Sequence, residues 1–155
     1  ADNSPGQYAH QTEDQWCEGM VQQCVSGTLE GGCRGCKREG NLVRIVDGVV
    51  SMNELRQTAT EMFGDLVKAV VDVDRGLVAV DAELHSDLEA LLLDNGSSQA
   101  SLWGINLYPE EAGEGFVEFD SMINMRPSQN NRSRGVEDER TRSLIDAIVR
   151  KRVIE

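Results

Sequence analysis

A hairpin signal in the middle of the chain constrains the fold more than any other feature. Residues 65–83 read DLVKAVVDVDRGLVAVDAE, two valine-rich runs separated by Asp74-Arg75-Gly76. Two such runs joined by a short polar turn that contains glycine are typical of neighbouring antiparallel strands. We therefore expect an antiparallel sheet at the centre of the fold.

Three helices are predicted around this hairpin. Ser51 and Glu54 have the spacing of a capping box in front of apolar residues at helical intervals. Ser86 and Glu89 repeat that pattern for a short second helix. Asp138 is the predicted N-cap of a last helix, whose end is basic, as the helix dipole favours.

Two further strands complete the expected sheet. They read LWGINLYP at residues 102–109 and GFVEFDSMINMRP at residues 115–127, and both alternate polar and apolar side chains. The economical assembly is an α+β fold, with an antiparallel sheet of about four strands and helices packed on one face. We expect this domain over residues 49–155, preceded by an N-terminal extension over residues 1–48.

Composition limits the partners that the chain can have. Its 155 residues, 39% of them apolar, suit one globular domain with a small additional module. Uninterrupted apolar runs such as Leu91–Leu93 are far shorter than the roughly 18 residues of a membrane span, so no span is predicted. Residues 1–125 hold 22 acidic and 7 basic residues within a chain of net charge −12. This balance argues against nucleic acid as a partner.

The extension differs in character from the rest of the chain. Residues 12–27, TEDQWCEGMVQQCVSG, predict a short amphipathic helix, and the glycine-rich residues 27–40 predict a loop. The chain begins with Ala-Asp and no initiator Met, which is what remains after a signal is cut at a small-residue site. A shortened recombinant chain is the alternative. We expect an organellar or extracytoplasmic location.

Four cysteines in the extension carry its most distinctive chemistry: Cys17, Cys24, Cys33 and Cys36. On a helix, Cys17 and Cys24 are separated by about 10 Å of rise, which is too far for a bond between them or for one shared zinc ion. Two disulfides from helix to loop are therefore predicted, nested by preference as Cys24 to Cys33 and Cys17 to Cys36. A zinc site, a redox-active CRGC and four free thiols are the alternatives.

One face of the predicted sheet is polar. Alternation places Asp81, Glu83 and His85 on this face from one segment, and Asp120 and Asn124 from another. Carboxylates with one imidazole suit a divalent ion or acid/base catalysis. However, every one-sided sheet alternates in this way, and a histidine before a helix commonly packs or caps. We predict no catalytic residues, no metal and no cofactor.

Three arginines, Arg126, Arg132 and Arg134, follow the last predicted strand and precede the last helix. One interpretation is an anion or carboxylate site, because a helix N-terminus favours anions. The preferred interpretation is a loop clamp, in which the guanidinium groups bind the protein's own Asp and Glu side chains.

Three blocks of the sequence resemble a known family. They are EMFGDLVKAVVD, ELHSDLEALLLDNGSSQASLWGINLYPEE and EFDSMINMRPSQNNRSRGVED. The family comprises small microbial and plastid-lineage proteins and is catalogued as a domain of unknown function. The resemblance runs from about Ser51 to the end of the chain and implies a compact α+β domain with no assigned activity. The cysteine-bearing extension departs from the family pattern, as does Asn130, where glycine is expected.

Two classes of function follow. The first is a non-catalytic accessory or assembly subunit of a larger, membrane-bound complex, docked through the extension because a glycine-rich terminus without a core must be tied down. Its predicted anchors are Tyr8, Trp16, Met20 and Val21. The plastid-lineage relatives make a photosynthetic complex and the thylakoid lumen the expected setting. The second class, less favoured, is a small enzyme or an anion- or metal-ligand-binding protein that uses the polar face and the arginine loop.

Overall fold

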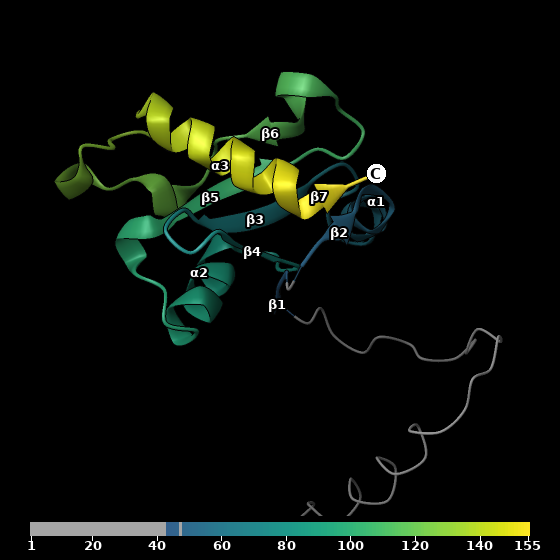
Figure 1. The fold of residues 1–155 in the computed structure, drawn as a ribbon, viewed down its shortest axis with the longest axis horizontal. Coiled ribbons are helices and arrows are strands. Elements are labelled where there is room, and N and C mark those ends of the chain that lie inside the picture. The colour runs from purple at the N-terminus through teal and green to yellow at the C-terminus, as the bar shows by residue number, and fades with distance from the viewer. Residues whose placement is uncertain (1–42, 47) are drawn as a thin grey trace, which may run out of the picture. The chain divides into compact units, whose positions relative to one another are not determined.

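The computed structural model describes residues 43–46 and 48–155, and these form an α+β domain around an antiparallel sheet (Figure 1). The five strands of the sheet lie in the order β1-β4-β3-β5-β6, and every neighbouring pair is antiparallel. Their bounds are β1 Arg44–Ile45, β3 Val67–Asp72, β4 Leu77–Val80, β5 Leu102–Leu107 and β6 Val117–Glu118. The predicted class is confirmed. The helix and loop predicted for residues 12–40, with all four cysteines, lie outside the described residues.

The predicted hairpin is confirmed as β3 and β4. Its turn is held by Asp72, whose Oδ1 accepts the backbone N–H groups of Asp74 at 2.9 Å and Arg75 at 3.0 Å. Gly76 has φ +65°, a left-handed conformation that glycine adopts without steric cost. The hairpin is therefore predictable from residues close together in the sequence: Asp72 and Gly76, which form the turn, and the apolar runs on either side.

The three helices are α1 Met52–Met62, α2 His85–Asp94 and α3 Glu139–Arg152. Two predicted caps form: Ser51 Oγ accepts the Glu54 N–H at 3.2 Å, and Asp138 Oδ2 accepts the Thr141 N–H at 2.8 Å. The predicted cap of the second helix is wrong. Its N-cap is Leu84, which makes no side-chain cap, and Ser86 lies inside the first turn.

The helices pack on both faces of the sheet, which corrects the expected one-sided arrangement. Val67, Ala69 and Val71 of β3 belong to the same core cluster as the buried residues of α1 and α3. Val70, on the opposite face, packs in a second cluster with Leu88 and Leu92 of α2. Figure 1 shows α3 lying across the sheet and α2 on its other side. A strand covered on both faces is apolar at consecutive positions, as β3 is, and does not alternate strictly.

A second, two-stranded sheet joins the start of α1 to the end of α3. It pairs β2, Val50–Ser51, in parallel with β7, Val153–Ile154. Arg152 reinforces this junction, because its guanidinium donates to the carbonyls of Gly76 at 3.0 Å and Gly48 at 2.8 Å. Within residues 43–46 and 48–155, no helix has the length and apolar character needed to cross a membrane.

The strand expected over residues 115–127 is much shorter than predicted. β6 ends at Glu118, and a 3-10 turn, η4, covers Met122–Asn124. Asn124 is fully buried, so it does not lie on an exposed polar face. Its side chain makes hydrogen bonds to the backbone of Gly104 that a neighbouring strand would otherwise supply. The η4 turn and these side-chain hydrogen bonds therefore take the place of the predicted strand, and the polar and apolar residues here no longer face opposite sides of a sheet.

Candidate functional site

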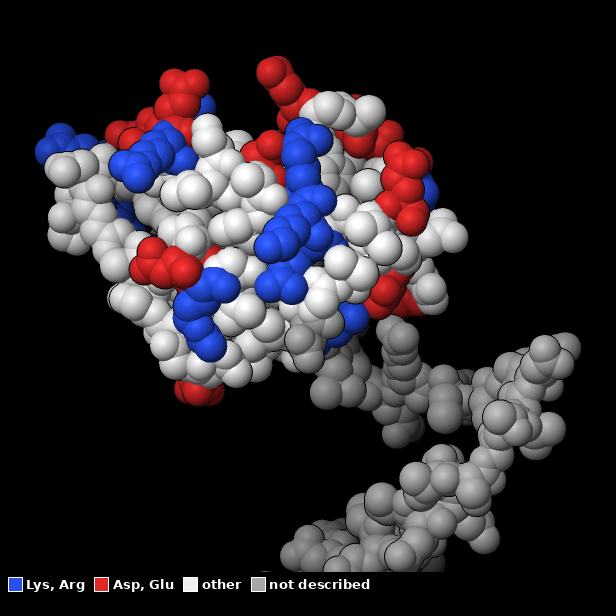
Figure 2. Space-filling view, viewed as in Figure 1, with Lys and Arg blue, Asp and Glu red and all other residues white. Residues whose placement is uncertain are grey.

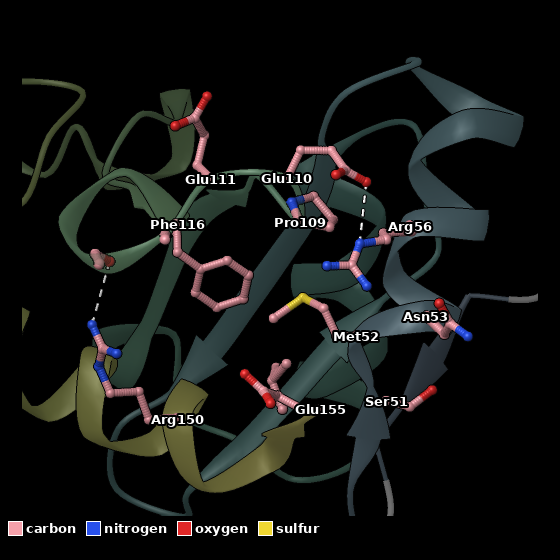
Figure 3. Close-up of a pocket in the computed structure, with 13 residues that line it drawn as sticks. Ser51, Met52, Asn53, Arg56, Pro109, Glu110, Glu111, Phe116, Arg150 and Glu155 are labelled. Carbon is pink, nitrogen blue, oxygen red and sulfur yellow. Dashed lines mark hydrogen bonds and ion pairs between the residues drawn. The ribbon is translucent and has the colours of Figure 1, made fainter.

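A groove of about 900 Å³ lies between the start of α1, the loop that follows β5 and the end of α3 (Figure 3). Its walls come from segments far apart in the sequence: residues 51–56, 109–116 and 150–155. The short β2–β7 pairing brings the first and last of these together. The groove is open to solvent, and its volume is in the range of ligand-binding clefts, about 300–1,000 Å³.

The floor of the groove is apolar. Met52, Phe116 and Val153 all line it, and Figure 3 shows the Met52 side chain and the Phe116 ring facing each other across the cavity. Phe116 belongs to the core cluster, while Met52 and Val153 pack against that cluster and are partly exposed. The hydrophobic core of the domain is therefore accessible at this place.

Two arginines hold the loop of residues 109–113 from opposite sides. Arg56 of α1 forms an ion pair with Glu110, with 3.1 Å between Nε and Oε1. Arg150 of α3 donates to the Gly113 carbonyl at 3.4 Å and to Asp146 Oδ2 at 2.6 Å. The hydrogen bond and the charge of Asp146 raise the pKa of Arg150. Both guanidinium groups therefore already have a carboxylate partner.

Two further carboxylates line the groove, Glu111 and Glu155, and neither has an ion-pair partner among the residues that the structure describes. In Figure 3, Glu155 borders the cavity below Met52, whereas the Glu111 side chain points away from the floor. Figure 2 shows acidic side chains gathered over the loop that follows β5 and a band of basic side chains across the end of α3. Among the charged residues that line the groove, those without an ion-pair partner in the described residues are therefore both carboxylates.

The four residues considered for a metal or catalytic site do not converge. Asp81 has φ +70°, which ends the alternation of β4, and its Oδ2 pairs with Arg44 Nε at 2.5 Å. Arg44 also binds Glu54 of α1 at 2.6 Å. The Glu83 side chain is exposed, and its backbone carbonyl accepts from Lys68 Nζ. In the described part of the chain, no group of three or more His, Cys, Asp and Glu could hold a metal ion.

His85 and Asp120 do line a common cavity, of about 230 Å³, together with Arg134. His85 Nε2 lies 2.8 Å from the Ile105 carbonyl, so this nitrogen donates the hydrogen bond. Burial lowers the pKa of His85, although the Ile105 carbonyl opposes the shift. The Asp120 carboxylate binds Arg134 through two bonds, of 2.7 and 3.0 Å. Each group therefore has its own partner within the fold.

Asn106 also lines this second cavity and is only 7% exposed. Its Nδ2 donates to Glu118 at 2.8 Å, but its Oδ1 is buried without a hydrogen-bond partner among the described residues. Lys68, its cross-strand neighbour, contributes to the same wall. An unpaired buried acceptor is costly, so a donor at this position would be favourable.

The arginine loop is the segment that carries Arg126, Arg132 and Arg134, and these three side chains contact the rest of the domain to different degrees. Arg126 donates to the carbonyls of Ile123 and Gln99 and pairs with Glu89 at 3.3 Å. Its guanidinium also lies 5.4 Å from the centre of the Trp103 ring. Burial lowers the pKa of Arg126, while the charge of Glu89 opposes the shift. The Arg126 side chain thus acts as a clamp within the domain.

Arg134 and Arg132 lie further out. Arg134 is committed to Asp120, and the Arg132 side chain is exposed with no ion pair in the described residues. The loop itself is organised by the buried Asn131, whose Nδ2 donates to Asn124 and Gly135 carbonyls and whose Oδ1 accepts the Glu137 N–H. Within this segment, the Asn131 side chain makes more hydrogen bonds than the side chain of Arg132 or Arg134 does.

The groove residues were missed by sequence reasoning. In the sequence, Met52 is only one of the apolar positions that follow Ser51 at helical intervals. Val153 and Glu155 carry no signal, because their proximity to Met52 depends on the β2–β7 pairing. The acidic, glycine-containing PEEAGEG stretch at residues 109–115 was the one local indication of a special loop. The predicted partner anchors Tyr8, Trp16, Met20 and Val21 lie outside the described residues.

Comparison with known proteins gives one family. Residues 44–152 match the family described as "Protein of unknown function (DUF5674)". This confirms the resemblance to a domain family of unknown function, and it moves the start of the matched region from about Ser51 to Arg44. No curated protein and no solved structure matches. The match includes all three helices, the five-stranded sheet and most of the groove.

Proposed function

The chain belongs to the DUF5674 family, and we propose that it is a non-catalytic accessory or assembly subunit that binds a protein partner. The observation that carries the proposal is the groove, where Met52, Phe116 and Val153 form an apolar floor inside a charged rim. An apolar centre with a polar rim is the usual anatomy of a protein interface. The domain thus offers a surface that is suited to contact with another chain.

The ionisable side chains of the polar face support binding over catalysis. Acid/base catalysis needs groups within hydrogen-bond reach of one reacting atom. Here the Asp81 carboxylate is bound to Arg44, the His85 imidazole to the Ile105 carbonyl, and the Asp120 carboxylate to Arg134. Each of these three groups is therefore held by its own partner within the domain, although His85 and Asp120 border one cavity.

The extension is proposed as the principal docking element. It contains Tyr8, Trp16, Met20 and Val21, which are the proposed anchors, and aromatic residues and Met are enriched where one chain is buried against another. Its even number of cysteines suits an oxidising compartment, and a membrane-bound complex in the thylakoid lumen is the proposed setting.

Deletion of residues 1–40 tests the proposal, because β1 begins only at Arg44 and the sheet stays complete. The truncated chain is expected to remain folded by circular dichroism and to lose its co-purifying partner in affinity purification from the native source. Recovery of the same partner at undiminished yield by the truncated chain would show that the extension is not the docking element.

A small-ligand site is the second candidate, favoured by the cavity that His85, Asp120 and Arg134 share. The buried Asn106 Oδ1 needs a donor, and Lys68, which forms no ion pair within the described residues, supplies positive charge, so a small zwitterion such as an amino acid is the fitting class. Titration of the protein with glycine and alanine, followed by NMR, tests it. Saturable shifts of the His85 and Asn106 signals are expected, and unchanged spectra would exclude these ligands.

A further inference from the structure

We infer that the groove between α1, the loop of residues 109–113 and α3 binds an extended segment of a partner protein in which basic residues flank an apolar one. This inference rests on the proposed role as a binding subunit and specifies the chemistry that the partner must present. Three observations carry it: the apolar floor, the engaged arginines and the unmatched carboxylates.

The floor selects an apolar side chain. Met52 and Val153 are partly exposed, and Phe116, although only 6% exposed itself, forms the bottom of the cavity between them. A Leu or Val side chain placed there would remove apolar surface from water on both molecules, which is favourable in proportion to the area covered. The side chains of Met52, Phe116 and Val153 offer no hydrogen-bond donor to a polar side chain.

The charges of the rim select a cation. Arg56 is paired with Glu110 and Arg150 with Asp146, so neither guanidinium is available without breaking an existing ion pair. Glu111 and Glu155 have no such partner in residues 43–46 and 48–155. An acidic segment would meet these carboxylates and be repelled, whereas Lys or Arg would complement them.

The shape selects a segment of chain. The groove has a volume of about 900 Å³ and is open to solvent, so a compact small molecule would leave much of its own surface exposed. The occupant is also unlike a second copy of this chain. A symmetric dimer brings the same patch of each copy together, and here both arginines of that patch are paired within their own copy, so neither copy would supply a cation to the carboxylates of the other.

A short synthetic peptide with Lys and Arg on either side of a Leu-Val pair is the probe. It is titrated into the full-length, ¹⁵N-labelled chain and followed by NMR. Saturable shifts are expected in the signals of Met52, Phe116, Val153 and Glu155. Two control peptides, one with Glu in place of Lys and Arg and one with Ser and Asn in place of Leu and Val, are expected to bind at least tenfold more weakly.

Paired variants locate the binding. Glu111→Lys combined with Glu155→Lys reverses two exposed charges without touching the core, and the affinity for the basic peptide should fall by roughly tenfold. As the control, Asp74→Lys combined with Asp94→Lys, a reversal of two exposed charges in the β3–β4 turn and at the end of α2, changes the net charge by the same amount and should leave the affinity unchanged. Equal losses in the two proteins would mean general charge attraction and would overturn the inference.

Other outcomes also decide the question. Equal binding of the acidic peptide, or no shifts in the groove signals at saturating basic peptide, would overturn the inference. Groove signals that move with protein concentration in the absence of peptide would identify the groove as a contact between copies. A further outcome is that the basic peptide produces no shifts while deletion of residues 1–40 abolishes recovery of the partner. That result would support the accessory role and would contradict only the assignment of the groove as a peptide-binding site.

Discussion

The side chain of Asn124 pairs with the backbone of Gly104 in both directions: Oδ1 accepts the Gly104 N–H at 2.8 Å, and Nδ2 donates to the Gly104 carbonyl at 2.9 Å. Nδ2 also reaches the Arg134 carbonyl at 2.8 Å. One buried amide therefore closes the edge of β5 and fastens the arginine loop to the sheet. The family block EFDSMINMRPSQNNRSRGVED thus contains residues that build the loop from within.

Asn124→Ala is expected to destabilise the domain. The change leaves the N–H and carbonyl of Gly104 without these partners, and an unsatisfied buried polar group costs about 1–3 kcal/mol. We expect a loss of about 2–5 kcal/mol in the free energy of unfolding, measured by urea denaturation. The exposed Gln129→Ala is the control, with an effect within about 0.5 kcal/mol. A similar, small effect of both changes would mean that the pairing is dispensable.

Gly104→Ala is expected to destabilise through a steric clash. A Cβ at this position would lie 2.5 Å from both the Cβ and the Oγ of Ser121, which is itself buried. Overpacking of this kind costs about 1–3 kcal/mol. In Gly135→Ala, the matched control, the new Cβ would lie 3.4 Å from the Phe119 carbonyl oxygen and 3.6 Å from Ser133 Oγ, which are ordinary contact distances, and little change is expected. Thermal unfolding of the two variants separates the cases, and equal melting temperatures would contradict the steric explanation.

Stability should fall in mildly acidic solution because of His85. Burial lowers the pKa of this imidazole from its ordinary value of 6.5, so the folded protein holds it neutral where the unfolded chain already takes up a proton. The contribution is fully present above pH 6.5 and is lost as the pH falls through the lowered pKa of the folded state. In His85→Gln, the slope of unfolding free energy against pH below 6.5 should be smaller than in the parent protein. Identical slopes would show that His85 is not responsible.

The extension should contain two disulfides that connect Cys17 and Cys24 with Cys33 and Cys36. Helical spacing keeps the first two cysteines apart, so each is expected to bond with the loop. The intact mass of the unreduced protein should be lower by four hydrogens than that of the fully reduced chain, since all four cysteines are bridged. Four cysteines that react with an alkylating reagent in the native protein, or bound zinc, would rule out the bridges.

Much of the fold could be predicted where the signal was local. Ser51 and Asp138 cap their helices through hydrogen bonds three residues ahead, and the β3–β4 turn depends on Asp72 and Gly76 within the same short segment. These contacts form between near neighbours, so spacing in the sequence was sufficient to find them.

The predictions that failed depend on contacts between distant segments. Asn124 is buried because Gly104 lies opposite, not because of its place in an alternating run. Glu89 has the spacing of a capping residue, but its carboxylate binds Arg126 instead. The groove depends in the same way on the pairing of Val50 with Val153, which no local pattern indicates.

The accessory-subunit role is tested most directly by one measurement on the full-length chain: quantitative affinity purification with Trp16→Ala compared with Gln23→Ala, a polar position in the same segment. Truncating an aromatic anchor at the centre of an interface costs about 2 kcal/mol or more, roughly a thirtyfold loss of affinity. If the extension is the principal contact, the Trp16→Ala chain recovers little of the partner and the Gln23→Ala chain recovers the parental amount. Equal recovery by the two variants, with unchanged circular dichroism spectra, would contradict docking through the extension.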